Sequence, residues 1–441
     1  MKGPKKIMLR KNIAIVISSF VGHCIVYGTT WSIGIFSSMF QEALQEDNMV
    51  LFSWIGTINT AAVYAICPVS NLIMNKLGYK WTTIIGGCLS SLGLLISSYA
   101  YNSTIILLSF GILTGIGLGI SYIPIISIVS VYCDIHRSIA VGISVSGAGM
   151  GTFIYPCIMS IFTTNYGWRN TLLLLSGITM NLVAVGCVIN EPVLISKTDL
   201  MVNKNSILPR TNLNSRAEQL TDYSKNDPKF RKEFNGIVSF LHNIWSIISR
   251  KLNFNLFKSL NFLILCFNNL LVHGSLSIIL LFLNRYSESK GNNDLQNSLI
   301  VSIFGIFSIF GRVTFGILKS SSSITAVDMY SISLAILGLF VFSFPFIQLY
   351  AVMIIFTGIF GILSSPSGCL LPEVVVEIVG LKSFNFAFSY LMIFEAIGFL
   401  VSGPLASIIY VSTKSFYKVF ALSSILLIVG NAVMIIPRRT K

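Results

Sequence analysis

The chain has 441 residues, of which 54% are hydrophobic and only 10% are charged, whereas soluble domains carry about 25% charged residues. This composition excludes an ordinary soluble domain, so we interpret the net charge of +14 as a sign of membrane topology and not of nucleic-acid binding. The eight cysteines show neither paired nor metal-type spacing, and neither a disulfide framework nor a metal site is predicted.

Long apolar stretches follow one another along the chain, and each matches the roughly 20 residues that cross a bilayer as a helix. The first follows basic residues and is too long for the apolar core of a signal peptide, so it is predicted to remain as a span. The alternating ten-residue segments of a membrane β-barrel are missing from the sequence. We predict twelve spans, near residues 13–40, 52–74, 81–100, 103–131, 138–163, 170–190, 258–283, 297–317, 323–345, 347–371, 383–410 and 415–437.

The spans form two groups of six, separated by a polar insert rich in Asn, Ser, Lys and Asp. The sequence therefore predicts an all-α membrane protein with twelve transmembrane helices in two six-helix halves. Because the insert has little periodic apolar pattern, we predict a largely disordered linker there. The predicted parts are an N-terminal segment 1–12, a first half 13–190, a linker 191–257, a second half 258–437 and a tail 438–441.

The distribution of basic residues predicts the orientation. With both termini in the cytoplasm, 24 of the 30 Lys and Arg residues fall in cytoplasmic segments, and five fall outside. Positive charge is enriched on the cytoplasmic side of membrane proteins. An even number of spans with both ends inside is thus predicted.

The two halves resemble one another where the second span of each half ends. Residues 70–78, SNLIMNKLG, and residues 311–319, GRVTFGILK, are the two exits, and each contains a Gly and a Lys in its last four residues. Six plus six spans with a polar bridge are typical of the parallel repeats of the major facilitator superfamily.

Small residues recur at four-residue spacing in two spans of the first half, and they predict close helix packing. This packing serves either as a sliding surface for alternating access or as a static contact. The small residues concerned are Gly111, Gly115 and Gly119, with Gly117 between them, in the fourth span and Gly142, Ser144, Ser146, Gly147 and Gly151 in the fifth.

Residues 131–147, VYCDIHRSIAVGISVSG, resemble the fifth-span signature of the monocarboxylate transporter family. Shorter matches are Ser53-Trp54-Ile55, residues 166–169, residues 27–36 and residues 398–406, and the likeness covers residues 13–190 and 258–437. The resemblance implies a major facilitator fold, transport of small organic carboxylates by alternating access, and a place in the plasma membrane. It also allows for a single-span accessory protein as a partner.

Three positions are compared with the charged positions of the proton-coupled members of this family. Arg312 keeps the family's arginine of span eight, and the resemblance implies that it binds the substrate carboxylate. Trp31 stands where those carriers have a lysine, and Ser308 stands where they have an aspartate. The resemblance therefore leaves proton symport, exchange and facilitated diffusion open.

Two ionisable residues lie inside otherwise apolar spans. Burial of a guanidinium in a bilayer costs at least about 2.5–3.5 kcal/mol, so Arg312 is predicted to face a cavity, where its planar group matches a carboxylate. The alternative is a structural ion pair near the end of the span. Glu395 is predicted to carry a proton or to pair with Arg312, and the alternative is a neutral helix contact.

Further polar residues of the spans are weaker candidates. His23 and His273 occupy equivalent first-span positions of the two halves and are candidates for proton coupling, although a buried histidine is often a packing group. Trp31 would replace a charge by an aromatic wall and favour a larger, partly apolar solute. The remaining candidates for substrate contact are Tyr27, Asn59, Asn268, Asn269 and Ser308.

Asp134 and Arg137, with His136 between them, lie in the turn between spans four and five. They are predicted to form a charge lock that holds one conformation, and the alternative is a solvated turn.

The function predicted from these observations is secondary transport of small organic carboxylates, with protons as a second partner left open. The alternatives are a facilitative carrier of aromatic amino acids or other amphipathic solutes, and a non-transporting membrane sensor that signals through the insert. An enzyme is not predicted, because the sequence contains no P-loop, no nucleophile elbow and no metal-ligand cluster. No cofactor and no nucleic-acid partner are expected.

Overall fold

The structure, a computed structural model, describes residues 4–44, 49–133, 137–189, 254–292 and 294–434. Every regular element in these residues is helical. The chain divides into two compact units, Met1–Glu191 with Ser259–Lys441, and Pro192–Lys258. In the second unit the described part is the 3₁₀ turn η4 (Phe254–Lys258), so the predicted linker lies almost wholly outside the described residues.

The N-terminal half is built from long helices that two glycines divide. Gly78 has a φ of 83° within α4, and Gly167 has a φ of 77° within α7, values that side chains other than glycine rarely allow. Each marks the turn between two predicted spans. The elements are α1 (Pro4–Trp31), α2 (Ile33–Leu44), α3 (Met49–Ala65), α4 (Cys67–Ser98), α5 (Ser103–Ile106), the π-helix η1 (Leu107–Thr114), α6 (Gly115–Tyr132), α7 (Arg137–Thr179) and α8 (Asn181–Val188).

The C-terminal half repeats this plan. The tenth span, predicted over residues 347–371, extends to Val379 in the structure. It is interrupted near Pro366 and Pro372, because proline supplies no N–H for the helical hydrogen bond. The elements are α11 (Leu260–Ser289), α12 (Asp294–Ser321), α13 (Ala326–Phe342), η5 (Phe344–Phe346), α14 (Tyr350–Ser364), α15 (Pro366–Cys369), α16 (Leu371–Val379), η6 (Leu381–Ser383), α17 (Phe384–Thr413) and α18 (Phe416–Val433).

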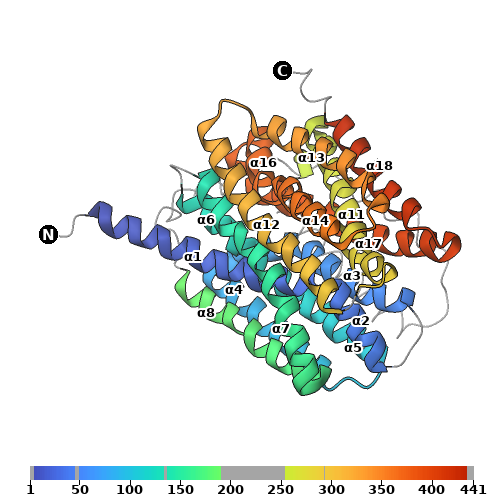
Figure 1. Cartoon of the computed structure of the whole chain (residues 1–441). Coiled ribbons are helices and arrows are strands. Elements are labelled where there is room, and N and C mark those ends of the chain that lie inside the picture. The colour runs from blue at the N-terminus through green and yellow to red at the C-terminus, as the bar shows by residue number, and fades with distance from the viewer. Residues whose placement is uncertain (1–3, 45–48, 134–136, 190–253, 293, 435–441) are drawn as a thin grey trace, which may run out of the picture. The chain divides into compact units, whose positions relative to one another are not determined.

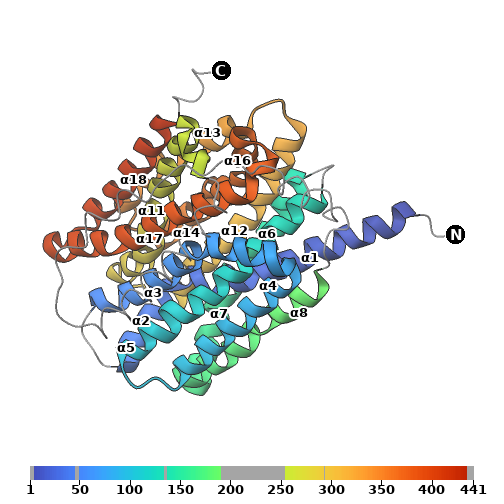
Figure 2. The same cartoon turned by 180° about the vertical axis from the view of Figure 1, so that it is seen from behind.

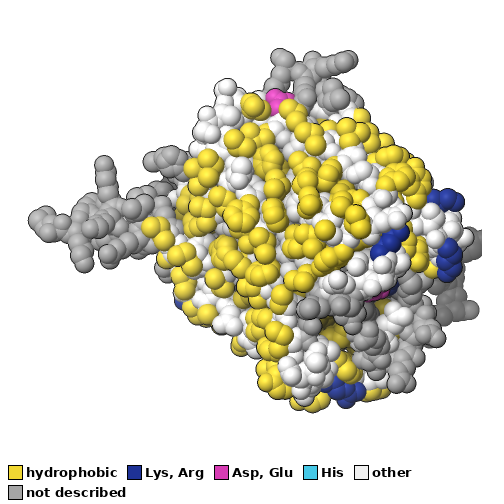
Figure 3. Space-filling view, in the orientation of Figure 1, with side chains coloured by type: hydrophobic (Ala, Val, Ile, Leu, Met, Phe, Trp, Pro, Cys, Tyr) yellow, Lys and Arg dark blue, Asp and Glu magenta, His cyan; other side chains and the backbone are white. Residues whose placement is uncertain are grey.

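The protein is an integral, multi-pass membrane protein. Eleven helical stretches among the described residues are long and apolar enough to cross a bilayer. The twelfth crossing is α3, with 17 residues, continued by the first turns of α4 up to Gly78. Figure 3 shows a broad face of hydrophobic side chains with Lys and Arg at its margins, and large apolar residues such as Leu339 are well exposed. Such a surface is stable in lipid and unstable in water.

The two halves meet along two pairs of helices, α7 with α12 and α3 with α17 (Figures 1 and 2). Glycines permit the first contact: a Cβ atom on Gly149 would lie 2.7 Å from the carbonyl oxygen of Gly305, and one on Gly142 would lie 3.0 Å from that of Arg312. Gly147 instead faces Phe20 of α1. The glycines of the fifth span therefore allow close packing against two helices, α1 of the same half and α12 of the other half.

Candidate functional site

A small cavity lies where the two halves meet. Its volume is about 10 Å³, about the space that one water molecule needs. It brings together Trp31, Arg312 and Glu395, which are 7%, 3% and 3% exposed. The other lining residues are Tyr27, Tyr122, His273, Ser367, Gly368, Leu371, Phe388 and Met392.

Arg312 of α12 is a buried cation without an acidic partner among the described residues. Its Nη1 donates to the carbonyl oxygen of Val145 on α7, 3.0 Å away. Its guanidinium lies 5.9 Å from the ring centres of both Tyr27 and Trp31, an arrangement that stabilises a cation modestly. Such a group retains strong affinity for an anion, because its charge is desolvated and not neutralised.

Free donor capacity and space lie on one side of this guanidinium. The Nε of Arg312 is buried and has no hydrogen-bond partner in the described part of the chain. A Cβ atom on Gly368 would lie 3.8 Å from Nε and 3.9 Å from Nη2. The glycine therefore leaves room beside the edge of the guanidinium that a carboxylate would approach.

Glu395 of α17 pairs with His273 of α11, at 3.4 Å between Oε1 and Nε2. The Nδ1 of His273 lies 3.1 Å from the carbonyl oxygen of Asn269. Because a carbonyl can only accept, Nδ1 carries a hydrogen, and a neutral His273 presents a lone pair at Nε2. The contact with Glu395 is then favourable only when the pair shares a proton. The expectation that Glu395 pairs with Arg312 is therefore not what the structure shows.

Three tyrosines of the N-terminal half, Tyr27 on α1, Tyr64 on α3 and Tyr122 on α6, form what we call the tyrosine cluster. The hydroxyls of Tyr27 and Tyr122 are 3.2 Å apart, and the rings of Tyr64 and Tyr122 meet edge to face at 6.0 Å. The side chain of Tyr64 also has polar interactions with Tyr27 and with the carboxyl of Glu395. The cluster therefore lies between the arginine and the glutamate.

The sequence matches the profile of the Major Facilitator Superfamily over residues 19–371. The chain belongs to the major facilitator superfamily. This membership confirms the predicted twelve-helix fold in two halves, and it agrees with the packing of α7 on α12 and of α3 on α17.

Relatives of this superfamily member are monocarboxylate transporters. Monocarboxylate transporter 12 of Mus musculus is 26% identical over 422 residues, which are 95% of this chain and 84% of the relative. Monocarboxylate transporter 14 of Homo sapiens is 24% identical over 96% of this chain and 89% of its own length. Monocarboxylate transporter 2 of Mus musculus is 24% identical, with 96% and 83% covered. These relatives confirm the resemblance to that family and the prediction of a transporter and not an enzyme.

His23 of α1 and His273 of α11 make similar local contacts in the first helix of each half. The Nδ1 of His23 donates to the carbonyl oxygen of Ser19 at 2.8 Å, as that of His273 does to Asn269, also four residues earlier. His23 does not line the cavity, but its ring stacks on Tyr27 at 6.1 Å, and its buried Nε2 has no partner among the described residues. Its role in proton coupling stays a prediction.

Three predicted substrate contacts of the transporter lie away from the cavity lining. The Nδ2 of Asn59 donates to the carbonyl oxygen of Phe110 at 2.6 Å. The Oδ1 of Asn268 accepts from the hydroxyl of Tyr330 at 3.0 Å. Ser308 is buried, and its carbonyl oxygen accepts from the hydroxyl of Ser365. Substrate contact by Asn59, Asn268 and Ser308 therefore stays a prediction.

Most of the predicted charge lock lies outside the described residues, so it stays a prediction. Asp134 and His136 lie outside the described residues, and only the backbone of Arg137 lies within them, as the first residue of α7. A different charged contact occurs in the C-terminal half, where Lys319 and Glu377 lie 3.2 Å apart. The carboxylate of Glu377 also accepts from the backbone N–H groups that begin α13. Sequence reasoning missed this contact.

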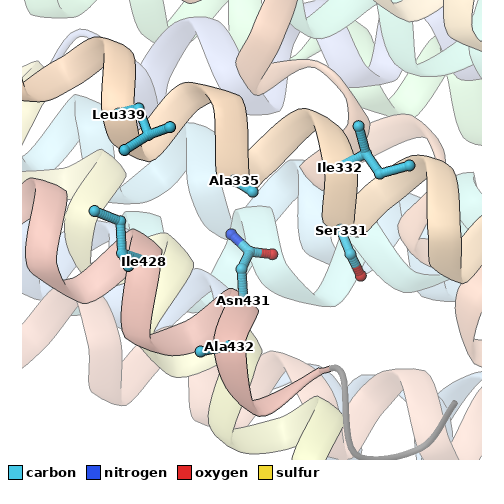
Figure 4. Close-up of a pocket in the computed structure, with 7 residues that line it drawn as sticks. All are labelled: Ser331, Ile332, Ala335, Leu339, Ile428, Asn431 and Ala432. Atoms are coloured by element: carbon cyan, nitrogen blue, oxygen red, sulfur yellow. The ribbon is translucent and has the colours of Figure 1, made fainter.

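A second hollow, of about 310 Å³, lies between α13 and α18 (Figure 4). Most of its lining is apolar, and Ile332, Leu339 and Ile428 are exposed on the outer surface of the bundle. No charged side chain lines it. It therefore lacks the chemistry of an anion site, and the cavity at Arg312 remains the candidate. Its lining residues are Ser331, Ile332, Ala335, Leu339, Ile428, Asn431 and Ala432.

Proposed function

We propose that this transporter carries small organic carboxylates by alternating access and that Arg312 binds the carboxylate. The observation that carries the proposal is a guanidinium, 3% exposed, that has no acidic partner among the described residues and has an unused Nε beside Gly368. The same class of substrate is contained in the names of its relatives, monocarboxylate transporters 12 and 14. Because the cavity holds about one water, the halves must separate before a substrate enters.

The aromatic wall supports a substrate with an apolar body. Trp31 stacks on Phe304 at 5.8 Å and lies over Arg312, where proton-coupled relatives are expected to have a lysine. One positive charge is thereby replaced by a flat apolar surface. This feature favours a second candidate function, facilitative transport of aromatic amino acids or other amphipathic solutes.

The His273–Glu395 pair supports proton coupling by a route other than the missing lysine and aspartate. The pair holds one proton in the arrangement described above, and it lines the same cavity as Arg312. Release of that proton would remove the attraction that holds the pair together. We place both termini in the cytoplasm and the protein in the plasma membrane, as the charge bias and the resemblance favour, with a single-span accessory protein as a further partner.

Uptake into proteoliposomes tests the substrate role of Arg312. We expect Arg312→Ala to lower the uptake of lactate, phenylacetate or phenylalanine at least about tenfold, because a hydrogen bond to a charged group contributes about 1.5–3 kcal/mol. Uptake that matches the wild type would contradict carboxylate binding by Arg312.

Arg169→Ala is the matched control for this experiment. Arg169 also donates to a backbone carbonyl, that of Ala100, and also lies over a tryptophan ring, that of Trp168. It does not line the cavity. The control should keep wild-type uptake.

A further inference from the structure

The tyrosine cluster connects two charged groups that do not pair with each other. Arg312 and Glu395 both belong to the C-terminal half, whereas Tyr27, Tyr64 and Tyr122 all belong to the N-terminal half. Tyr64 interacts with the carboxyl of Glu395, and Tyr27 lies against the guanidinium of Arg312. The polar interaction of Tyr64 with Tyr27 completes a path from one charged group to the other.

A chain of hydroxyl groups has a direction. Each phenol has one proton and donates one hydrogen bond at a time, although its oxygen also accepts. The chain can therefore direct its O–H groups toward one end or toward the other, and each bond polarises the next. Two anions placed at opposite ends of the chain would compete for the same protons.

The charge of the His273–Glu395 pair decides how strongly its end attracts the chain. When the pair has lost its shared proton, Glu395 is a carboxylate, and hydrogen bonds to an ionised acceptor are about twice as strong as neutral ones. The O–H groups then point toward Glu395. When the pair holds the proton, its net charge is zero, and the chain is free to turn toward an anion beside Arg312.

We propose that the tyrosine cluster couples proton binding at the His273–Glu395 pair to carboxylate binding at Arg312, with Tyr64 as the positioning residue that joins the two halves. This inference rests on the proposed function, because it assumes that a carboxylate binds at Arg312. No proton moves along the cluster: the pair takes up and releases its proton by itself, and only the direction of the O–H groups changes.

Other polar groups near the cluster do not supply the same connection. The thiol of Cys67 lies 3.4 Å from the carbonyl oxygen of Val63, and the hydroxyl of Tyr330 donates to Asn268. The groups that face Glu395 or the cluster from the packed elements are Tyr27, Tyr64, Cys67, Tyr122, Asn269, His273, Arg312 and Tyr330, with His23 against the rings of Tyr27 and Tyr122.

Binding measurements across a range of pH test the proposal. Lactate, phenylacetate and phenylalanine are each bound to the full-length protein in lipid nanodiscs, and Kd is measured at each pH. For the wild type we expect Kd to fall as the pH falls. The value should be about fivefold to a hundredfold lower when the His273–Glu395 pair holds its proton than when it has lost it. Tyr64→Phe keeps the ring that stacks on Phe399 and removes one hydroxyl, and we expect less than about a twofold change over the same range.

Tyr155→Phe is the matched control, because Tyr155 is also a buried tyrosine of the N-terminal half but does not line the cavity and is not part of the tyrosine cluster. It should keep the wild-type pH dependence. Tyr27→Phe breaks the same path at its other end and keeps the ring that lies over Arg312. It replaces Tyr64→Phe as the test should the latter fail to fold.

Two outcomes overturn the inference and separate it from the proposed function. Wild-type pH dependence in Tyr64→Phe, combined with loss of binding in Arg312→Ala, would leave carboxylate binding at Arg312 intact and remove the coupling through tyrosines. Failure of wild-type protein to bind any of the three compounds would contradict the proposed function and this inference together.

Discussion

At the scale of single residues, the site depends on which charges have partners. Arg312 has a backbone carbonyl and two aromatic rings, whereas Glu395 has the ring of His273. A direct pair of Arg312 with Glu395 would neutralise both groups and leave little affinity for a substrate. Separate partners keep the arginine available to an anion and keep the glutamate able to exchange a proton.

Glu395→Gln tests the proton-carrying role of the pair. An amide has nearly the shape of the carboxyl and can donate to Nε2 of His273, but it cannot gain or lose a proton at physiological pH. We expect uptake into proteoliposomes to lose its response to an inward proton gradient, while exchange of labelled against unlabelled carboxylate continues. Glu288→Gln, at an exposed position near the end of α11, is the control. A response as large as in the wild type would show that the coupling proton is held elsewhere.

At the scale of elements, the first turn of α13 depends on a side chain from α16. A helix begins with four N–H groups that have no partner within the helix. Glu377 accepts from two of them, those of Ala326 and Val327, at 2.9 and 3.3 Å, and Thr325 accepts from Asp328. Lys319 of α12 pairs with the same carboxylate, so three helices are joined at one group.

Glu377→Ala should loosen the start of α13. Loss of a capping side chain costs about 1 kcal/mol, and loss of the partly exposed ion pair adds less than about 1 kcal/mol. We expect backbone hydrogen exchange in residues 326–330 to become roughly tenfold faster. The control is Glu373→Ala one turn earlier on α16, because Oε1 of Glu373 has no hydrogen-bond partner among the described residues. Equal effects of the two substitutions would contradict this capping role.

Sequence reasoning predicted the elements better than the contacts between them. The spans, the two halves, Arg312 and Glu395 were predictable because charges stand out within apolar stretches. The pairing of Glu395 with His273 was not predictable, since it depends on how α11 and α17 are rotated about their axes. Tyr64 and Tyr122 were missed because a tyrosine in an apolar span differs little from a packing residue. The signal that could have been used is that each is a tyrosine inside an otherwise apolar span, Tyr64 in the second and Tyr122 in the fourth.

At the scale of the whole molecule, the closed arrangement depends on the contact of α7 with α12. The backbones approach each other at Gly149 and Gly305, where an added Cβ atom would lie 2.7 Å from a carbonyl oxygen. Farther along the same contact, the sulfur of Cys157 lies 3.6 Å from the hydroxyl of Ser302. Cys157 is partly buried in this arrangement, and separation of the halves would therefore expose it further.

Gly149→Ala should shift the population away from the closed arrangement, because overpacking of this kind costs about 1–3 kcal/mol. We expect faster reaction of Cys157 with a membrane-permeant maleimide, in a protein whose other cysteines have been replaced. Gly177→Ala is the control, since a Cβ atom there would meet nothing within 4 Å. Unchanged labelling by Gly149→Ala would show that the glycine contact does not determine closure.

The acceptor that holds Arg312 in the closed protein is a main-chain oxygen, that of Val145 on the opposite half. No side-chain replacement at position 145 can take that oxygen away, so the contact tolerates sequence change there. Each time α7 and α12 part, the guanidinium loses this hydrogen bond, and a desolvated donor is left without an acceptor. An arriving carboxylate supplies a new acceptor for that donor. Separation of the halves therefore costs less free energy when solute is present than when it is absent.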